Sequence, residues 1–296
     1  MKNLFITAIL LYAALWGYNK ANHNFYVSNI TLKHWVPLEH SPSNTADETK
    51  EAQAILHQPF KYLAKGRQSF IFESEDKKYV LKFIKCQRIN VSDTYEKFPL
   101  PAFLDKKRKN NLLERDDRLK RMFTSMALAK DPLKELTGIL YLHITPTQEL
   151  QKTVTLIDRL GFSHSVVIDS VPFILQKKAD KVFPVLKKLM KAKDTKGLKV
   201  RLDQLINLFV QRASLGIIDP DKGLLTRNNI GFIEDRAIYI DLGTFKRSAK
   251  SASRKYLAQD LKKLAPIVRW LKSHDKQLAR QFVDTMNTAV QTYEQK

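Results

Sequence analysis

The sequence has one cysteine and few glycines, and each shortage removes a class of site. Cys86 stands alone among 296 residues, so a disulfide within the chain and a cysteine metal cluster are both excluded. The 7 histidines are scattered and show no zinc-binding spacing. The 9 glycines leave few positions where the backbone can approach a phosphate group closely.

Long hydrophobic runs are also missing. An apolar run broken by a single threonine spans Leu4–Trp16. A membrane-spanning helix needs about 20 apolar residues, so this run is short for a span and suits the core of a secretory signal. A cleaved signal, an uncleaved anchor and a buried N-terminal element all remain open. We expect the protein to be membrane-associated or exported through residues 1–17, in preference to a cytoplasmic location.

Acidic residues are scarce relative to basic ones, and the net charge is 51 − 30 = +21. Such an excess indicates an anionic partner, unless it is simply a solvated basic surface. Basic residues gather in residues 177–201 and 246–255. Aromatic residues are not interleaved with them, as they are in single-stranded nucleic-acid grooves. We therefore expect a nucleotide and an anionic substrate or anionic membrane surface as partners, and no specific nucleic acid.

The predicted elements change from strands to helices along the chain. Hydrophobic residues make up 44% of it, enough for a buried core. Apolar runs separated by charged turns predict strands within residues 60–85 and 138–176, with a helix over residues 105–130 between them. Helical patterns dominate from about residue 181 onward. The sequence therefore predicts an α+β fold with two lobes.

These elements divide the chain into four predicted segments. A polar stretch, HSPSNTADET, favours a loop between the N-terminal run and the first strand. The segments are a signal or anchor over residues 1–17, a linker or extension over 18–58, a strand-rich first lobe over 59–178 and a mainly helical second lobe over 179–296.

Lys82 lies inside an apolar strand-like segment, Tyr79–Ile84. If the strand is buried, its ammonium needs an anion; if the strand lies at an edge, the lysine can reach water. The helix over 105–130 offers a partner. Asp116 falls about 40° from the centre of its apolar stripe, whereas Glu114 falls about 160° away. We therefore expect Asp116 to face the core and pair with Lys82.

Polar residues bracket a predicted hairpin over residues 230–240, where two apolar runs flank a charged turn. Asn228 and Asn229 precede the first run, and Asp241 follows the second. The preceding loop adds two further carboxylates, Asp219 and Asp221. Carboxylate and amide oxygens are the ligands that Mg²⁺ prefers. Because asparagine and aspartate are also common turn residues, an ordinary turn remains the alternative.

The order of these features resembles the protein-kinase-like fold. YVLKFIK resembles the strand that carries a phosphate-pairing lysine. PFILQKKAD resembles the strand that runs into the hinge. GIIDPD and NNIGF resemble the two ends of a catalytic loop, and YIDLG resembles the motif whose aspartate binds Mg²⁺. The resemblance covers about residues 60 to 245.

For the nucleotide, the resemblance implies ATP as a cofactor and assigns three residues. Lys82 would orient the phosphates, and Asp116 would tether it. Gly66 would lie in the loop that covers the phosphates.

For the metal and the acceptor, the resemblance implies Mg²⁺ and leaves two choices open. Asp241 would bind Mg²⁺ together with Asn228 or Asn229. Asp219 or Asp221 would orient the acceptor hydroxyl.

The sequence departs from the kinase pattern in several places. The segment LAKGRQSF carries one glycine, Gly66, where kinases have several. Ile217 stands in the place of the usual histidine, and Asp219 precedes Asn228 by nine residues instead of about five. Only 55 residues follow Asp241, so the chain resembles compact small-molecule and lipopolysaccharide kinases.

Two functions follow from the resemblance, with an unrelated α+β fold as the remaining alternative. The first is an ATP-dependent phosphotransferase acting on a saccharide, small-molecule or protein hydroxyl. The second is a pseudokinase, a basic membrane-associated binding module with weak or no catalysis. The retained lysine, asparagines and Asp241 favour the first, and the glycine-poor loop favours the second.

Overall fold

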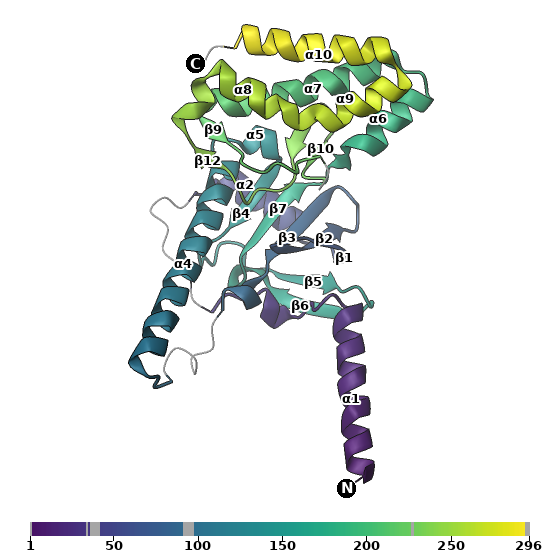
Figure 1. Cartoon of the computed structure of the whole chain (residues 1–296). Helices are drawn as coiled ribbons and strands as arrows, with labels where there is room; N and C mark the ends of the chain where they lie inside the picture. Colours follow the sequence, from purple (N-terminus) through teal and green to yellow (C-terminus); the bar gives the residue numbers. More distant parts are fainter. Residues whose placement is uncertain (1, 34, 36–41, 91–97, 226–227, 294–296) are drawn as a thin grey trace. The chain divides into compact units, whose positions relative to one another are not determined.

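The computed structural model describes residues 2–33, 35, 42–90, 98–225 and 228–293. The chain forms two compact units. Unit 1 is Met1–Arg121 together with Leu140–Gln176, and unit 2 is Met122–Ile139 together with Lys177–Lys296. Unit 1 contains a seven-stranded sheet and unit 2 is mainly helical, so the predicted α+β class is confirmed (Figure 1).

Unit 1 is built on a single mixed sheet. Its strands are β1 (Phe60–Lys65), β2 (Ser69–Ser74), β3 (Tyr79–Ile84), β4 (Ile139–His143), β5 (Thr153–Ile157), β6 (Ser163–Val167) and β7 (Phe173–Lys177). They lie in the order β4-β7-β3-β2-β1-β5-β6. Strands β1, β2 and β3 form an antiparallel meander. The β5–β6 hairpin extends the sheet beyond β1, with β5 pairing in parallel with β1.

Strand β2 packs one of its faces against the core of unit 1, as the period of two in its burial shows. Phe70 and Phe72 are fully buried, whereas Ile71 between them is partly exposed. Residues from 18–58, the segment predicted as a linker, also enter this core. They are Phe25, Ile30, Ala52, Ile55 and Leu56, and the last three lie in or next to helix α2 (Ala46–Ile55).

Helix α2 begins at a complete capping box. The side chain of Thr45 accepts the Glu48 N–H at 3.2 Å, and the Glu48 carboxylate accepts the Thr45 N–H at 2.9 Å. Part of the predicted linker, residues 34 and 36–41, lies outside the described residues, as does Met1 of the predicted signal or anchor.

Unit 2 is a layer of helices over short strand pairs (Figure 1). Its helices are α5 (Lys134–Thr137), α6 (Val182–Lys191), α7 (Thr195–Ser214), α8 (Arg254–Leu261), α9 (Ala265–His274) and α10 (Lys276–Gln291), besides the end of α4 (Ala102–Lys130). Its strands are β8 (Asp180–Lys181), β9 (Ile217–Ile218), β10 (Ile230–Phe232), β11 (Ala237–Tyr239) and β12 (Lys246–Arg247). Helix α7 packs between α6, α8 and α10 and buries an apolar stripe that includes Leu202, Leu205 and Phe209.

The predicted hairpin over residues 230–240 is confirmed as the antiparallel pair β10–β11, and β8 pairs with the other edge of β10. Gly231 permits that second pairing. A Cβ atom at this position would lie 2.6 Å from the backbone oxygen of Asp180, closer than side chains are observed to approach.

The N-terminal apolar run forms helix α1 (Lys2–Ala21), which extends from the rest of unit 1 near the β5–β6 hairpin (Figure 1). Its described apolar side chains are exposed, among them Phe5 at 69% and Tyr12 at 72%, so it is not a buried element. The expectation of membrane association or export through this segment is corrected. Among the described residues, none of the helices combines the length and the apolar character needed to cross a membrane. The helix is apolar only over its middle, and Asn19 and Lys20 close its last turn.

A buried carboxylate, Asp158, fixes the chain that follows α1 to the β5–β6 turn. Its side chain accepts hydrogen bonds from the amide of Asn22 at 3.0 Å and from Nε2 of His164 at 2.9 Å. The backbone N–H groups of Leu160 and Phe162 both donate to its other oxygen at 2.9 Å. Burial opposes the ionised form, but these hydrogen bonds outweigh it and lower the pKa of Asp158 below its usual value.

Replacing Asp158 with alanine should lower the free energy of unfolding by about 1–3 kcal/mol, because four donors lose a buried acceptor. A carboxylate with a lowered folded pKa stabilises above its unfolded pKa, and that contribution disappears as the pH falls through the folded pKa. The difference between wild type and Asp158→Ala in urea unfolding should therefore shrink as the pH falls below about 4. Asp47→Ala, which removes an exposed carboxylate, is the control. An equal loss in both variants would contradict this assignment.

Candidate functional site

The two ends of the β10–β11 hairpin lie together, as the sequence predicts. The carbonyl oxygen of Asn229, just before β10, accepts the N–H of Ile240 at 2.7 Å and the N–H of Asp241 at 3.4 Å. The backbone N–H of Asn229 in turn donates a hydrogen bond to the Leu224 carbonyl at 2.7 Å, which fixes the position of Asn229. An amide and a carboxylate that are twelve residues apart in sequence therefore leave the same end of the hairpin.

The structure separates the two asparagines. Asn229 is 9% exposed, and its Nδ2 donates to Oδ2 of Asp221 at 2.8 Å. Asn228 is exposed and has a φ of 56°, in the left-handed region that asparagine tolerates better than most residues. The side chain that reaches the Asp221 carboxylate is therefore that of Asn229, while Asn228 forms the turn.

The two aspartates of the loop, Asp219 and Asp221, also differ in burial. Asp221 is partly exposed, and its Oδ1 accepts the Gly223 N–H at 2.9 Å. Asp219 is 1% exposed, and its Oδ1 accepts the Asp221 N–H at 2.9 Å and the Thr244 hydroxyl at 2.7 Å. Burial raises the pKa of Asp219, although Arg212 and the hydrogen bonds from Thr244 and Asp221 oppose that shift. Asp221 is thus the carboxylate that a solute can reach.

The segment after Asp241 is held by a serine of helix α4. The Ser125 hydroxyl donates to the Leu242 carbonyl at 2.6 Å and accepts the Phe245 N–H at 2.7 Å. Asp241 itself is exposed, and its Oδ1 accepts the Gly243 N–H at 3.3 Å. The backbone around Asp241 is therefore fixed on both sides while its carboxylate faces solvent.

The donor set in unit 2 fits a hard cation. Because Nδ2 of Asn229 donates to Asp221, its Oδ1 is the atom of that amide suited to a metal. Together with the exposed Asp241 carboxylate, it offers the oxygen ligands that suit Mg²⁺, which commonly keeps several waters. Among the described residues no group of three or more His, Cys, Asp or Glu side chains is arranged to hold a metal ion, so a protein cage of that kind is not part of this site.

In unit 1, Lys82 occupies an internal strand. Strand β3 lies between β2 and β7, and Lys82 is 6% exposed. It stands opposite Ile71 in the register of β2 and β3. The edge-strand alternative is therefore excluded, and the lysine is a buried cation in the interior of the sheet.

Asp116 does not take the core-facing position that the helical wheel predicts. Its side chain is 41% exposed and pairs with Arg115, its neighbour in sequence, at 2.9 Å. The wheel argument needs a helix that is packed along its length. Helix α4 buries Leu119 and Phe123, but most of its residues before Leu119 are exposed, so the described part of the chain forms no core beside Asp116. Among the described contacts of Asp116, Lys82 does not appear.

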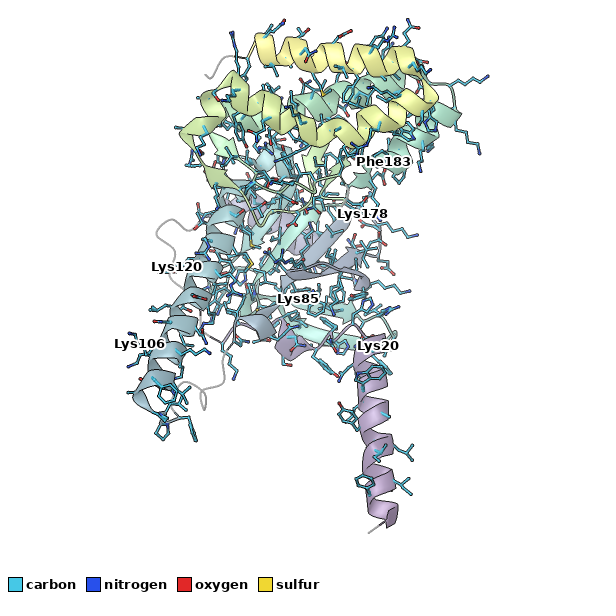
Figure 2. The ribbon with its side chains drawn as sticks, viewed as in Figure 1. Lys20, Lys85, Lys106, Lys120, Lys178 and Phe183 are labelled. Carbon is cyan, nitrogen blue, oxygen red and sulfur yellow. The ribbon has the colours of Figure 1, made fainter. Side chains whose placement is uncertain are left out.

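Gly66 lies in the turn between β1 and β2, where its N–H donates to the Ser69 carbonyl at 2.9 Å. The ammonium of Lys85 donates to the Gly66 carbonyl and lies 5.0 Å from the ring centre of Phe70. Lys85 is buried, with 3% of its surface exposed. By contrast, Lys106 and Lys120 on α4 are exposed lysines whose side chains extend away from the helix (Figure 2). The turn is thus anchored by a lysine side chain that the sequence did not single out.

Sequence reasoning also missed the polar side chains beneath the loops of unit 2. They are Ser125, Arg212, Thr244, Asp260 and Lys263. A signal was present for one of them: Arg212 continues the apolar stripe of α7, three residues after Phe209, so a charged group was due to be buried there. The others come together only through tertiary structure.

No protein family matches the sequence, and no curated protein matches it. Among solved structures, the chain is similar to the bifunctional kinase-methyltransferase WbdD, with 14% identity and a TM-score of 0.35. The match covers 68% of this chain and 35% of that one, so the chain spans about a third of the length of that protein. The function must therefore be inferred from the chemistry of the site and not from this similarity.

The different positions of the two asparagines predict different mutational effects. Asn229→Ala should lower the free energy of unfolding by about 1–3 kcal/mol, because it removes the hydrogen bond to Asp221 from a buried position. Asn228→Gly should change it by less than about 0.5 kcal/mol, since glycine adopts a positive φ without strain. Chemical denaturation of both variants measures the difference, and equal losses would count against the assignment of Asn229 to the interior.

Proposed function

We propose that the protein is an ATP-dependent phosphotransferase that transfers a phosphoryl group to a saccharide, small-molecule or protein hydroxyl. The observation that carries the proposal is the double connection of Asn229. Its side chain bonds to Asp221, and its backbone oxygen accepts the N–H of Asp241. These bonds keep Asp221, Asn229 and Asp241 in one loop cluster, which supports a role for Asp221 toward the acceptor and for Asn229 and Asp241 toward a metal.

Each residue has a role in this proposal. Asn229 and Asp241 would hold Mg²⁺, which when bound neutralises phosphate charge. The partly exposed Asp221 orients the acceptor hydroxyl by accepting its hydrogen bond. In unit 1, Lys82 would be the lysine that pairs with phosphate, as the resemblance implies. Asp219 is unsuited to the acceptor role because it is 1% exposed and its Oδ1 already accepts two hydrogen bonds.

The charge of the chain favours an anionic acceptor. Strand β12 places the exposed side chains of Lys246 and Arg247 five and six residues after Asp241. Cations close to the proposed metal loop attract an acceptor that carries phosphate or carboxylate groups and repel a cationic one. A phosphorylated or acidic saccharide fits this surface better than a neutral sugar.

A pseudokinase is the second candidate, and the β1–β2 turn favours it. The turn offers one glycine, and the Gly66 carbonyl is tied to the Lys85 ammonium. The neighbouring side chains of Arg67 and Gln68 are exposed at the point where a phosphate-covering loop needs close backbone approach. In this case the site binds nucleotide without rapid transfer.

Binding of ATP should depend on Mg²⁺ through Asp241. ATP should raise the melting temperature more with Mg²⁺ than with EDTA, since a ligand that binds only the folded state stabilises it by mass action. Asp241→Ala should abolish the difference between Mg²⁺ and EDTA. Asp235→Ala, at the opposite and exposed end of the same hairpin, should retain it. Mg²⁺ dependence that survives in Asp241→Ala would remove Asp241 from the site.

Turnover separates the two candidate functions. If the protein is a phosphotransferase, Asp221→Asn should reduce kcat by about 100-fold or more, with a smaller effect on ATP affinity. Lys82→Met should weaken ATP binding, while Lys78→Met, in the exposed β2–β3 turn, should not. Radiolabelled phosphate transfer from ATP and calorimetric ATP titration provide the two readouts. A wild-type protein that binds ATP with Mg²⁺ but transfers no phosphate to water or acceptor would favour the pseudokinase.

A further inference from the structure

Both loops of the proposed site donate a hydrogen bond to the same buried oxygen atom. Oδ1 of Asp219 accepts the backbone N–H of Asp221 in the first loop and the hydroxyl of Thr244 in the second. Thr244 follows Asp241 by three residues. The carboxylate therefore joins the segment that carries the proposed acceptor residue to the segment that carries the proposed metal ligand.

Asp219 is in turn held by two basic residues of the helical layer, Lys263 and Arg212. The Lys263 ammonium donates to the Asp219 backbone carbonyl and also pairs with Asp260 of α8 at 2.7 Å. The guanidinium of Arg212, on α7, lies 4.0 Å from Oδ2 of Asp219 and is itself paired with Asp260. Asp219 and Arg212 are 1% and 0% exposed, so these contacts form without competing solvent.

We propose that Asp219 and Thr244 are positioning residues that hold Asp221 and Asp241 in the relative arrangement required for a nucleotide–Mg²⁺ complex. This inference rests on the proposed function for its ligand, but the connection between the loops is a property of the protein alone. Neither residue touches the nucleotide or the acceptor. They act by fixing two backbone segments that also meet at Asn229 and, just outside the two loops, in the antiparallel pair of β9 and β12.

Thr244 is the better residue to change, because Asp219 has several partners. Thr244→Val removes the hydroxyl and keeps the branched shape, whereas Thr244→Ser keeps the hydroxyl and removes a methyl group. Thr244→Ala removes the hydroxyl without adding a methyl group, and it replaces the valine variant if that variant does not fold.

Hydrogen exchange of the full-length protein without nucleotide tests the connection directly. In Thr244→Val, amide exchange should accelerate by about tenfold or more in both loops, around Asp221–Gly223 and around Gly243–Phe245. Thr244→Ser should stay within about twofold of wild type. Acceleration confined to the second loop, or none at all, would overturn the proposal.

ATP titration tests the consequence for the ligand. In Thr244→Val the Kd for ATP with Mg²⁺ should rise by about tenfold, while the Kd in EDTA stays within about twofold. A general loss of structure would raise both values alike and would overturn the positioning role. A wild-type protein whose ATP binding ignores Mg²⁺ would overturn the proposed function, and the exchange experiment would still decide whether Asp219 and Thr244 join the loops.

Discussion

Burial of one guanidinium is the constraint on which the interior of unit 2 depends. Arg212 is fully buried, and a charge in that position is stable only with partners of opposite charge or with hydrogen-bond acceptors. Burial by itself would lower the pKa of Arg212, but Tyr239, Asp260 and Asp219 raise it above its usual value. The arginine therefore remains charged and requires these groups around it.

Its partners come from separate elements, which is why the arginine organises the unit. The Tyr239 hydroxyl in β11 accepts a hydrogen bond from Nη1 at 2.6 Å, and Asp260 in α8 accepts one from Nη2. Asp219 brings the loop after β9 to the same place. A buried ion pair adds little net stability when desolvation is counted, but it penalises any arrangement in which a partner is displaced. The loops of the proposed site are fixed on this interior.

Unit 1 also buries charged groups, but these are lysines that lie in the sheet and next to one of its turns. Lys82 is enclosed since β3 lies between two other strands, and Lys85 is used to hold the β1–β2 turn at Gly66. A chain with 9 glycines has few backbone positions that can serve as a phosphate loop. The β1–β2 turn has a single glycine, and the side chains of Arg67 and Gln68 in it are exposed.

The sequence by itself determined the α+β class, the strand that carries Lys82 and the hairpin that brings Asn229 and Asp241 together, because periodicity and turn chemistry are local. It did not decide whether Asn228 or Asn229, or whether Asp219 or Asp221, is the candidate site residue. The members of each pair differ in burial, and residues so close in sequence share the same local pattern. It misplaced Asp116, because a helical wheel assumes a core beside every turn of the helix. Only the tertiary structure brought Arg212, Thr244 and Asp260 to one place, because contacts over such sequence separations follow from packing and leave no local signal.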